Sequence, residues 1–205
     1  HSIPLISDIA FNKCEKLVEI TIPDSVRSIG REAFEACYAL ESVVIPEGVT
    51  SIAYAAFANS PNLQTVSLPS TLTSLGHSST SYDGVFQNCK KLETVTFAEG
   101  AKDATIGAET FLDCTSLKSV VIPGNYTTIY ADAFKNCSSL KSFTWKKSDY
   151  SYANQTLEYG ALIACSSLSN VSLPTTLKSI GNWAIAGSAA TDIVIPEGVT
   201  AIAYA

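Results

Sequence analysis

The fold is decided by Cys37-Tyr-Ala-Leu-Glu-Ser-Val-Val-Ile-Pro-Glu-Gly-Val-Thr-Ser-Ile-Ala-Tyr-Ala-Ala-Phe57, which is one period of a repeat. Its skeleton is C-x-x-L-x-x-V-x-I-P-x-x-V-x-x-I-x-x-x-A-F, and it starts again three residues after the Phe. Periods of this length are typical of solenoid proteins. The apolar residue at the Ile position of Ile-Pro recurs about every 23 residues, with three longer gaps. It is Ile22, Ile45, Leu68, Phe97, Ile122, Trp145, Leu173 and Ile195.

The first half of each unit predicts a β-strand. Leu40, Val43 and Ile45 are expected to point inward, and the end of this run has the alternation and the β-branched residues of a strand. Pro46 then removes a backbone donor and turns the chain. Because one unit cannot bury its own apolar face, neighbouring units must stack, and their strands must form a parallel sheet.

The second half of each unit predicts the return path of the coil. Val49 and Ile52 favour a short extended segment or a tight turn, and Ala56-Phe57 favours one short helical turn. The chain is therefore predicted to be an α/β solenoid. It would have a parallel sheet on one side and short extended or helical turns on the other.

The unbroken repeat predicts a single domain over residues 1–205, with about eight units of about 23 residues. The sequence begins and ends within a unit, at residues 9–14 and 199–205. Solenoids normally carry polar end caps, so we expect a fragment of a longer protein. Uncapped ends would expose sheet and core, which favours end-to-end self-association.

The charge balance excludes one large class of partner. The chain has 13 Lys and Arg against 19 Asp and Glu, which gives a net charge of −6. Nucleic-acid binding needs clustered basic residues, so no nucleic acid is expected. No apolar run approaches the ~20 residues of a membrane-spanning helix, so no membrane insertion is expected in this segment.

The six cysteines occupy one repeated slot, three residues after the Ala-Phe marker. Ser60 and Ser188 fill the same slot in the remaining units. A slot that accepts Cys or Ser favours a small buried side chain, and Cys is among the most often buried residues. We therefore predict reduced structural thiols. The alternatives, three disulfides, a zinc site or a catalytic thiol, fit a repeated slot less well.

The motif running from Cys14 through Ile29-Gly30 to Ala33-Phe34 resembles the BspA-like, or Treponema-type, leucine-rich repeat. The resemblance covers essentially the whole chain. It departs at Ala98, which replaces Pro, at Lys146, which follows Trp145, and before Ile193, where one residue is missing. The resemblance implies a curved, right-handed leucine-rich-repeat coil. It also implies display on the surface of a host-associated bacterium, or of a protist, and adhesion to host proteins or other cells.

Two side chains on each strand are expected to face outward, and this face is rich in Ser and Thr. One interpretation is that such residues simply suit an exposed parallel sheet. The other is a flat recognition surface for a protein or a glycan. The candidate partner-binding residues on this face are Thr65, Ser67, Thr94, Thr96, Ser142 and Thr144.

Two insertions, at residues 77–83 and 146–159, form the second candidate site. Insertions in repeat proteins map to loops that often lie on the binding face, and Tyr gives contact area at low entropic cost. The alternative is a tolerated exposed loop. The candidate residues are Tyr82, Tyr150, Tyr152 and Tyr159.

The motifs of the common enzyme classes are absent. The chain has two His and lacks G-x-S-x-G, P-loop, G-x-G-x-x-G and H-E-x-x-H motifs. Asp24, Glu47, Glu99 and Glu197 recur at the turn after the strand and could hold Ca²⁺, but other residues interrupt this column, so a solvated turn is the better interpretation. We expect no enzyme, no catalytic residues, no cofactor and no metal.

The sequence thus favours an extracellular, surface-displayed module that binds a host or neighbouring-cell surface protein. Two alternatives remain at this point. One is a passive stalk or scaffold segment, and the other is a carbohydrate-binding module that uses exposed aromatic residues.

Overall fold

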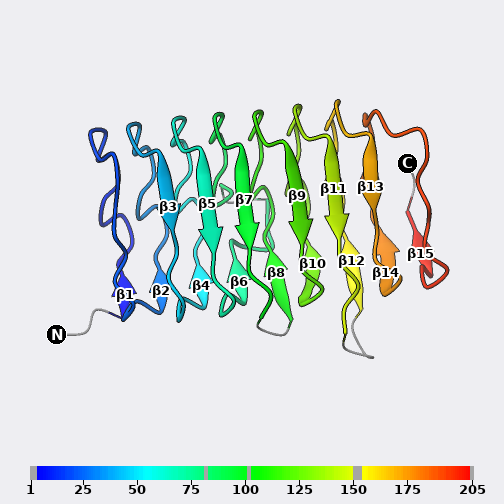
Figure 1. Ribbon diagram of the computed structural model, residues 1–205, viewed down its shortest axis with the longest axis horizontal. Coiled ribbons are helices and arrows are strands. Elements are labelled where there is room, and N and C mark those ends of the chain that lie inside the picture. Colours follow the sequence, from blue (N-terminus) through cyan, green and yellow to red (C-terminus); the bar gives the residue numbers. More distant parts are fainter. Residues whose placement is uncertain (1–3, 81–82, 101–102, 150–153, 204–205) are drawn as a thin grey trace.

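The computed structural model describes residues 4–80, 83–100, 103–149 and 154–203. Within these ranges the chain forms fifteen short strands and no helix. Every strand pair is parallel. The coils stack side by side in one row along the long axis of the molecule (Figure 1).

The strands belong to two sheets. The nine-stranded sheet contains β1 (Leu5–Ile6), β2 (Ser28–Ile29), β4 (Ser51–Ile52), β6 (Ser74–Leu75), β8 (Ala104–Ile106), β10 (Tyr126–Ile129), β12 (Gln155–Leu157), β14 (Leu177–Ile180) and β15 (Ala201–Ile202). The six-stranded sheet contains β3 (Ser42–Val44), β5 (Thr65–Leu68), β7 (Thr94–Phe97), β9 (Ser119–Ile122), β11 (Ser142–Trp145) and β13 (Asn170–Ser172).

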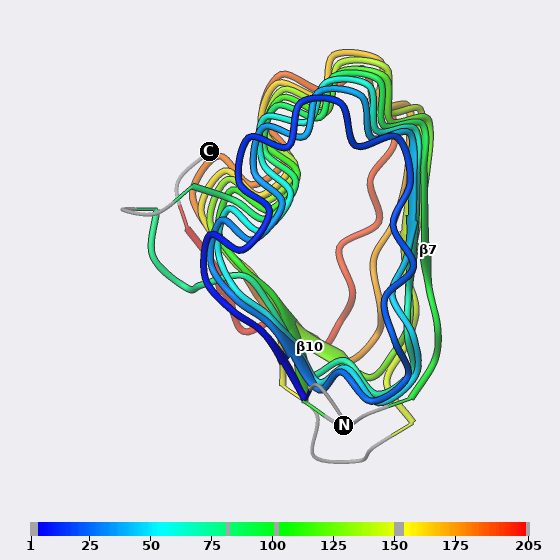
Figure 2. The ribbon, with the colours of Figure 1, turned by 90° about the vertical axis from the view of Figure 1, so that its left-hand side faces the viewer.

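The strand predicted before the Pro turn is confirmed in six units, as the odd-numbered strands β3 to β13, and these strands make the six-stranded sheet. The second extended segment is also a strand, as in β4, and it builds a sheet of its own. The solenoid therefore has parallel sheets on two sides of the coil instead of one. Viewed along the stack, β7 and β10 lie on different sides of the coil (Figure 2).

The sequence predicts a helical turn at Ala56-Phe57, but the structure has consecutive tight turns there, over residues 54–59. Ala55 and Asn59 have φ values of 55° and 58°, in the left-handed region that an α-helix does not use. The N–H groups of Ala55, Phe57 and Asn59 donate to carbonyls of the next coil, with N···O distances of 2.8–2.9 Å. Hydrogen bonds between coils thus replace those that a helical turn would make within itself.

A column of Phe rings fills the core beneath these turns. Neighbouring rings are stacked, with centroids 4.9–5.5 Å apart and interplanar angles of 14° or less. Stacked aromatic pairs are worth about 0.5–1.5 kcal/mol each beyond the area that they bury. The column therefore ties each coil to its neighbours; its members are Phe11, Phe34, Phe57, Phe86, Phe111 and Phe134.

The cysteine column runs beside the Phe column, and all six thiols are free, as predicted. The thiols of Cys37, Cys89, Cys114, Cys137 and Cys165 each donate to the carbonyl of the column Phe in the preceding coil, with S···O distances of 3.2–3.4 Å. Ser60 Oγ makes the same bond to Phe34 O at 3.4 Å. The slot accepts Cys or Ser because either side chain is small and can donate this hydrogen bond.

These thiols are expected to be unreactive in the folded chain. Burial raises the pKa of Cys37 to about 11 and the pKa of Cys89 to about 12. Because each pKa unit lowers the thiolate fraction tenfold, alkylation at pH 8 should be about 100-fold slower than in the unfolded chain or more. Peptide mapping after iodoacetamide treatment, with and without denaturant, measures this. Fast native labelling of Cys89 would show that the column is not packed as described.

Candidate interaction surface

The outer face of the six-stranded sheet carries two columns of side chains in register. One column pairs Ser42 with Thr65, Thr65 with Thr94, Thr94 with Ser119, Ser119 with Ser142, and Ser142 with Asn170. The second column includes Ser67, which pairs with Thr96, and Thr144, which pairs with Ser172. Thr65, Thr94 and Thr96 are exposed, and Ser67, Ser142 and Thr144 are half-buried. Along β5, β7 and β11 these positions alternate with buried ones, which places the six side chains on the side of the sheet away from the core.

The hydroxyl groups of this face differ from those on the other side of the coil. Just before β4 and β6, the side chains of Thr50 and Thr73 donate to backbone carbonyls of the preceding coil, at 3.2 and 3.0 Å. On the outer face, by contrast, no hydrogen bond within the described chain involves the hydroxyls of Thr65, Thr94 or Thr96. The hydroxyl groups of these three Thr residues are therefore directed to solvent.

A hollow interrupts this face between β7 and β9. The two strands pair only at Thr94 and Ser119, whereas β5 and β7 pair over four residues. The inward-facing Val95 and Phe97 are 7% and 8% exposed, against 1% for Val66. The hollow has a volume of about 260 Å³. Val95 and Phe97 form its apolar floor, and hydroxyl, apolar and charged side chains surround them: Thr94, Thr96, Ser119, Val121, Pro123, Glu99 and Lys146.

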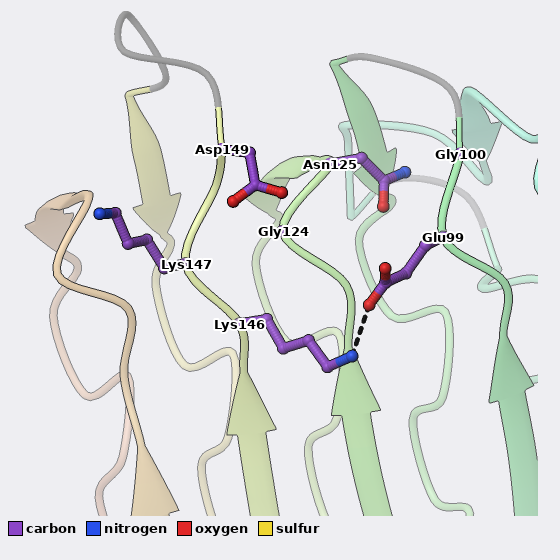
Figure 3. Close-up of a pocket in the computed structure, with 7 residues that line it drawn as sticks. All are labelled: Glu99, Gly100, Gly124, Asn125, Lys146, Lys147 and Asp149. Atoms are coloured by element: carbon purple, nitrogen blue, oxygen red, sulfur yellow. Dashed lines mark hydrogen bonds and ion pairs between the residues drawn. The ribbon is translucent and has the colours of Figure 1, made fainter.

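A second, charged hollow of about 420 Å³ adjoins the first at the ends of β7, β9 and β11 (Figure 3). Lys146 reaches past the turn at Gly124 and forms an ion pair with Glu99 (Figure 3). Asp149 points into the space beside this pair (Figure 3). Because both paired side chains are largely exposed, the pair itself contributes little to stability. Its two charges remain accessible to polar and charged groups of a partner.

Close contacts between turns set the shape of the charged hollow. A Cβ atom on Gly124 would lie 2.1 Å from Lys147 O, and one on Gly100 would lie 2.0 Å from Ser70 O. Such distances are far below any normal contact, so only glycine lets neighbouring turns approach this closely.

A buried amide holds the base of the insertion that begins at Lys146. Gln155 is fully buried, and its Nε2 donates to Lys146 O at 3.2 Å and to Tyr126 O at 3.1 Å. Thr176 Oγ1 donates to Gln155 Oε1 and accepts from the N–H of Ser148. The two sides of the insertion are thereby joined to each other and to the next coil.

The candidate Tyr residues do not all lie near the strand face. Tyr159 is 49% exposed, but it follows β12 and lines a groove along the nine-stranded sheet, with Ser179 and Ala201. The structure therefore brings the six Ser and Thr candidates together but leaves Tyr159 apart from them. Tyr82, Tyr150 and Tyr152 lie outside the described residues.

Neither the charged hollow nor the Gln155 contacts could be recognised from the sequence. Lys146 is 47 residues from Glu99, so the repeat pattern gives no sign of their pairing. The replacement of Pro by Ala98 and by Lys146 was the available signal, because Lys146 lines this hollow and Ala98 immediately precedes Glu99, which also lines it.

Metal ligation has no site in the part of the chain that the structure describes. No group of three or more His, Cys, Asp or Glu side chains there could hold a metal ion. Glu47 of the acidic turn column instead accepts hydrogen bonds from the N–H and the hydroxyl of Ser70, at 3.0 and 2.8 Å. Within the same described ranges, no helix has the length and apolar character to cross a membrane.

A family model described as a BspA type leucine rich repeat region, with six copies, matches residues 4–141 and 79–205. The chain belongs to the BspA-type leucine-rich repeat family. A comparison with curated proteins found no match.

Solved structures of bacterial leucine-rich repeat proteins have the same fold. A leucine-rich repeat protein from Eubacterium ventriosum is 26% identical over 86% of this chain, with a TM-score of 0.71. The TpLRR protein of T. pallidum is 24% identical over 87% of the chain, with a TM-score of 0.56. The pneumococcal vaccine antigen PcpA is 19% identical over 89%, with a TM-score of 0.51. The BspA-type chain spans 44%, 66% and 46% of these three chains, respectively.

Replacing Gln155 by Leu should loosen the base of the insertion. The side chain keeps a similar size, but the carbonyls of Lys146 and Tyr126 lose their donor, which costs about 1–3 kcal/mol for a buried group. Urea unfolding measures the loss. Thr105→Ala, a change at a half-buried position of β8, is the control and should stay within about 0.5 kcal/mol of the parent chain. Equal stability of the Gln155→Leu variant and the parent would contradict the assigned contacts.

Proposed function

We propose that this BspA-type chain is a non-enzymatic, surface-displayed module that binds a host or neighbouring-cell protein and so mediates adhesion. The outer face of the six-stranded sheet and the Tyr-rich insertion form its binding surface. One observation carries the proposal: the hydroxyls of Thr65, Thr94 and Thr96 face solvent without partners in the described chain, on strands fixed in register.

The chemistry of this face suits a protein partner. Strands lie about 4.8 Å apart in a sheet, so the hydroxyls form a rigid array of donors and acceptors. Such an array makes hydrogen bonds without the loss of conformational entropy that ordering long side chains would require. Exposed Val44 and Val121 add apolar contact area, and the Glu99–Lys146 pair adds charges at one end. A flat face with mixed polar and apolar contacts is typical of protein recognition surfaces.

Membership of the family supports an extracellular location, since proteins with BspA-type repeats are typically displayed on the cell surface. One solved relative in fold is described as a pneumococcal vaccine antigen, although its 19% identity concerns the fold alone. A carbohydrate partner is the second candidate. Tyr159 and Trp183, both 49% exposed, lie in the turns of successive coils and could stack on sugar rings.

The test is binding of the purified chain to immobilised extracellular-matrix proteins and to a glycan array. The Thr94→Arg/Thr96→Arg variant places two long charged side chains on the outer face. Binding to a protein of the panel should be saturable, and this variant should weaken it about tenfold or more. The Thr105→Arg variant is the control, because it places the same side chain on the nine-stranded sheet.

A companion variant, Tyr150→Ala/Tyr152→Ala/Tyr159→Ala, tests the insertion. Loss of binding in this variant alone would move the site from the strand face to the Tyr residues. Binding to glycans only, removed by Trp183→Ala, would replace the protein partner with a carbohydrate. No binding anywhere on the panel, with a folded chain, would favour a passive stalk.

A further inference from the structure

The last coil of the structure is paired on one sheet only. In the nine-stranded sheet, β15 pairs with β14 through Ser179 and Ala201 and through Ile180 and Ile202. In the six-stranded sheet, β13 is the edge strand, and residues 190–196 form no strand beside it. Figure 1 shows this segment standing away from β13 before it enters β15. The six-stranded sheet therefore ends one coil earlier than the nine-stranded sheet.

The sequence of the last coil explains why it stays open. Residues 188–196 read S-A-A-T-D-I-V-I-P, where the repeat requires C-x-x-L-x-x-V-x-I-P. One residue is missing, and it is the Leu whose equivalents Leu140 and Leu168 are fully buried. The segment is shorter by about 3.3 Å, the rise of one strand residue. It also lacks the side chain that would anchor it, and Ile195, at an inward position of the repeat, is 44% exposed, against 3% for Ile45.

A slot separates β13 from this displaced segment. It has a volume of about 370 Å³, with β13 on one side and Thr191 and Asp192 on the other. The core columns end here in partly open side chains. Val171 and Leu173 are half-buried, whereas the corresponding Phe143 and Trp145 of the preceding coil are 0% and 1% exposed. The slot thus exposes both the edge of a strand and apolar side chains that are only partly covered.

We propose that the outer edge of β13 is a second binding site, which takes an extended peptide segment as an added parallel strand. The backbone N–H and C=O groups on the open side of an edge strand form a template for another strand. An incoming segment with apolar residues at alternate positions would also cover Val171 and Leu173. This site adjoins the outer face, since Thr144 also lines the slot. It differs from that face because the peptide would be bound by the backbone of β13 and by the core columns, and not by the Ser and Thr hydroxyls.

A peptide fits the slot better than the chain's own residues 193–195. These residues match the V-x-I of the repeat, but the missing residue shortens the link to them from the turns at residues 182–187. The segment therefore does not lie along β13 as the equivalent segments of the other coils lie along theirs. Among the described residues no seventh strand joins this sheet, and the edge of β13 remains available.

The probe for the test is the labelled synthetic peptide TSLKSVVIP, which has the sequence of residues 115–123. In the folded chain these residues include β9, which pairs with β11 over four residues. Fluorescence anisotropy should show saturable binding to the chain. In a strand, alternate N–H groups face opposite neighbours. N-methylation of one alternate set should therefore weaken binding at least tenfold, and N-methylation of the other set should leave it nearly unchanged.

The matched protein variant has one Leu inserted between Ala190 and Thr191, which restores the repeat. This variant should pair its own last coil with β13, lose peptide binding and melt at a higher temperature. A Leu inserted between Ser78 and Ser79, in the first insertion, is the control and should leave peptide binding intact. The Thr94→Arg/Thr96→Arg variant should also bind the peptide normally, so this proposal and the proposed function can fail separately.

Three results would overturn the proposal. The first is the absence of saturable peptide binding. The second is equal binding of the two N-methylated peptides, since strand addition requires a difference between them. The third is strong hydrogen-exchange protection of the Val194 amide in the unmodified chain, because it would mean that residues 193–195 already occupy the edge.

Discussion

Stacking of one coil on the next is the interaction on which the whole structure depends. A coil of about 23 residues cannot bury its own apolar face, and within the described chain no helix provides local hydrogen bonds. The spacing of the Phe rings, 4.9–5.5 Å, is close to the strand spacing of about 4.8 Å in a sheet. Ring stacking and backbone pairing therefore reinforce each other at every step. One spacing governs the core, the turns and both sheets.

This single spacing also determines the surface. Any side chain type that recurs at one position of the repeat becomes a column on the folded molecule. The same rule that buries the thiols in a row aligns Thr65 and Thr94 on the outer face. Where a column is interrupted, the surface gains a local feature that the repeat itself does not provide. The Glu99–Lys146 hollow and the open edge of β13 are both interruptions of this kind.

Much of the fold could be predicted from the sequence, because apolar periodicity reports directly on which residues face inward. Val43 and Ile45 were placed correctly in this way, and the cysteine slot followed from its repetition. The turns could not be predicted, because Glu32 and Ala36 adopt positive φ without the Gly or Asn that usually signals it. For the second sheet, the sequence predicted short extended segments but not that they pair into a sheet, since two-residue strands such as β2 are too short to show an alternation.

The candidate surface was predictable to the same extent. Outward residues of the strands follow from the inward ones, so Thr94 and Thr96 could be named from the pattern. The position of Tyr159 could not, because it depends on where the insertion rejoins the coil, and β12 carries it to the nine-stranded sheet. The charged hollow arises from side chains of successive coils and from the close approach at Gly124. Contacts of that kind exist only after stacking.

Amide hydrogen exchange of the turn residues tests the stacking account most directly. The N–H groups of Phe34, Phe57 and Phe111 donate to the next coil at 2.7–2.9 Å, and the rings above them are fully buried. These amides should exchange as slowly as those of the central strands and lose protection together with them in denaturant. Rapid exchange of the Phe amides, with protected strands, would show that the turns are not tied between coils and would contradict the account.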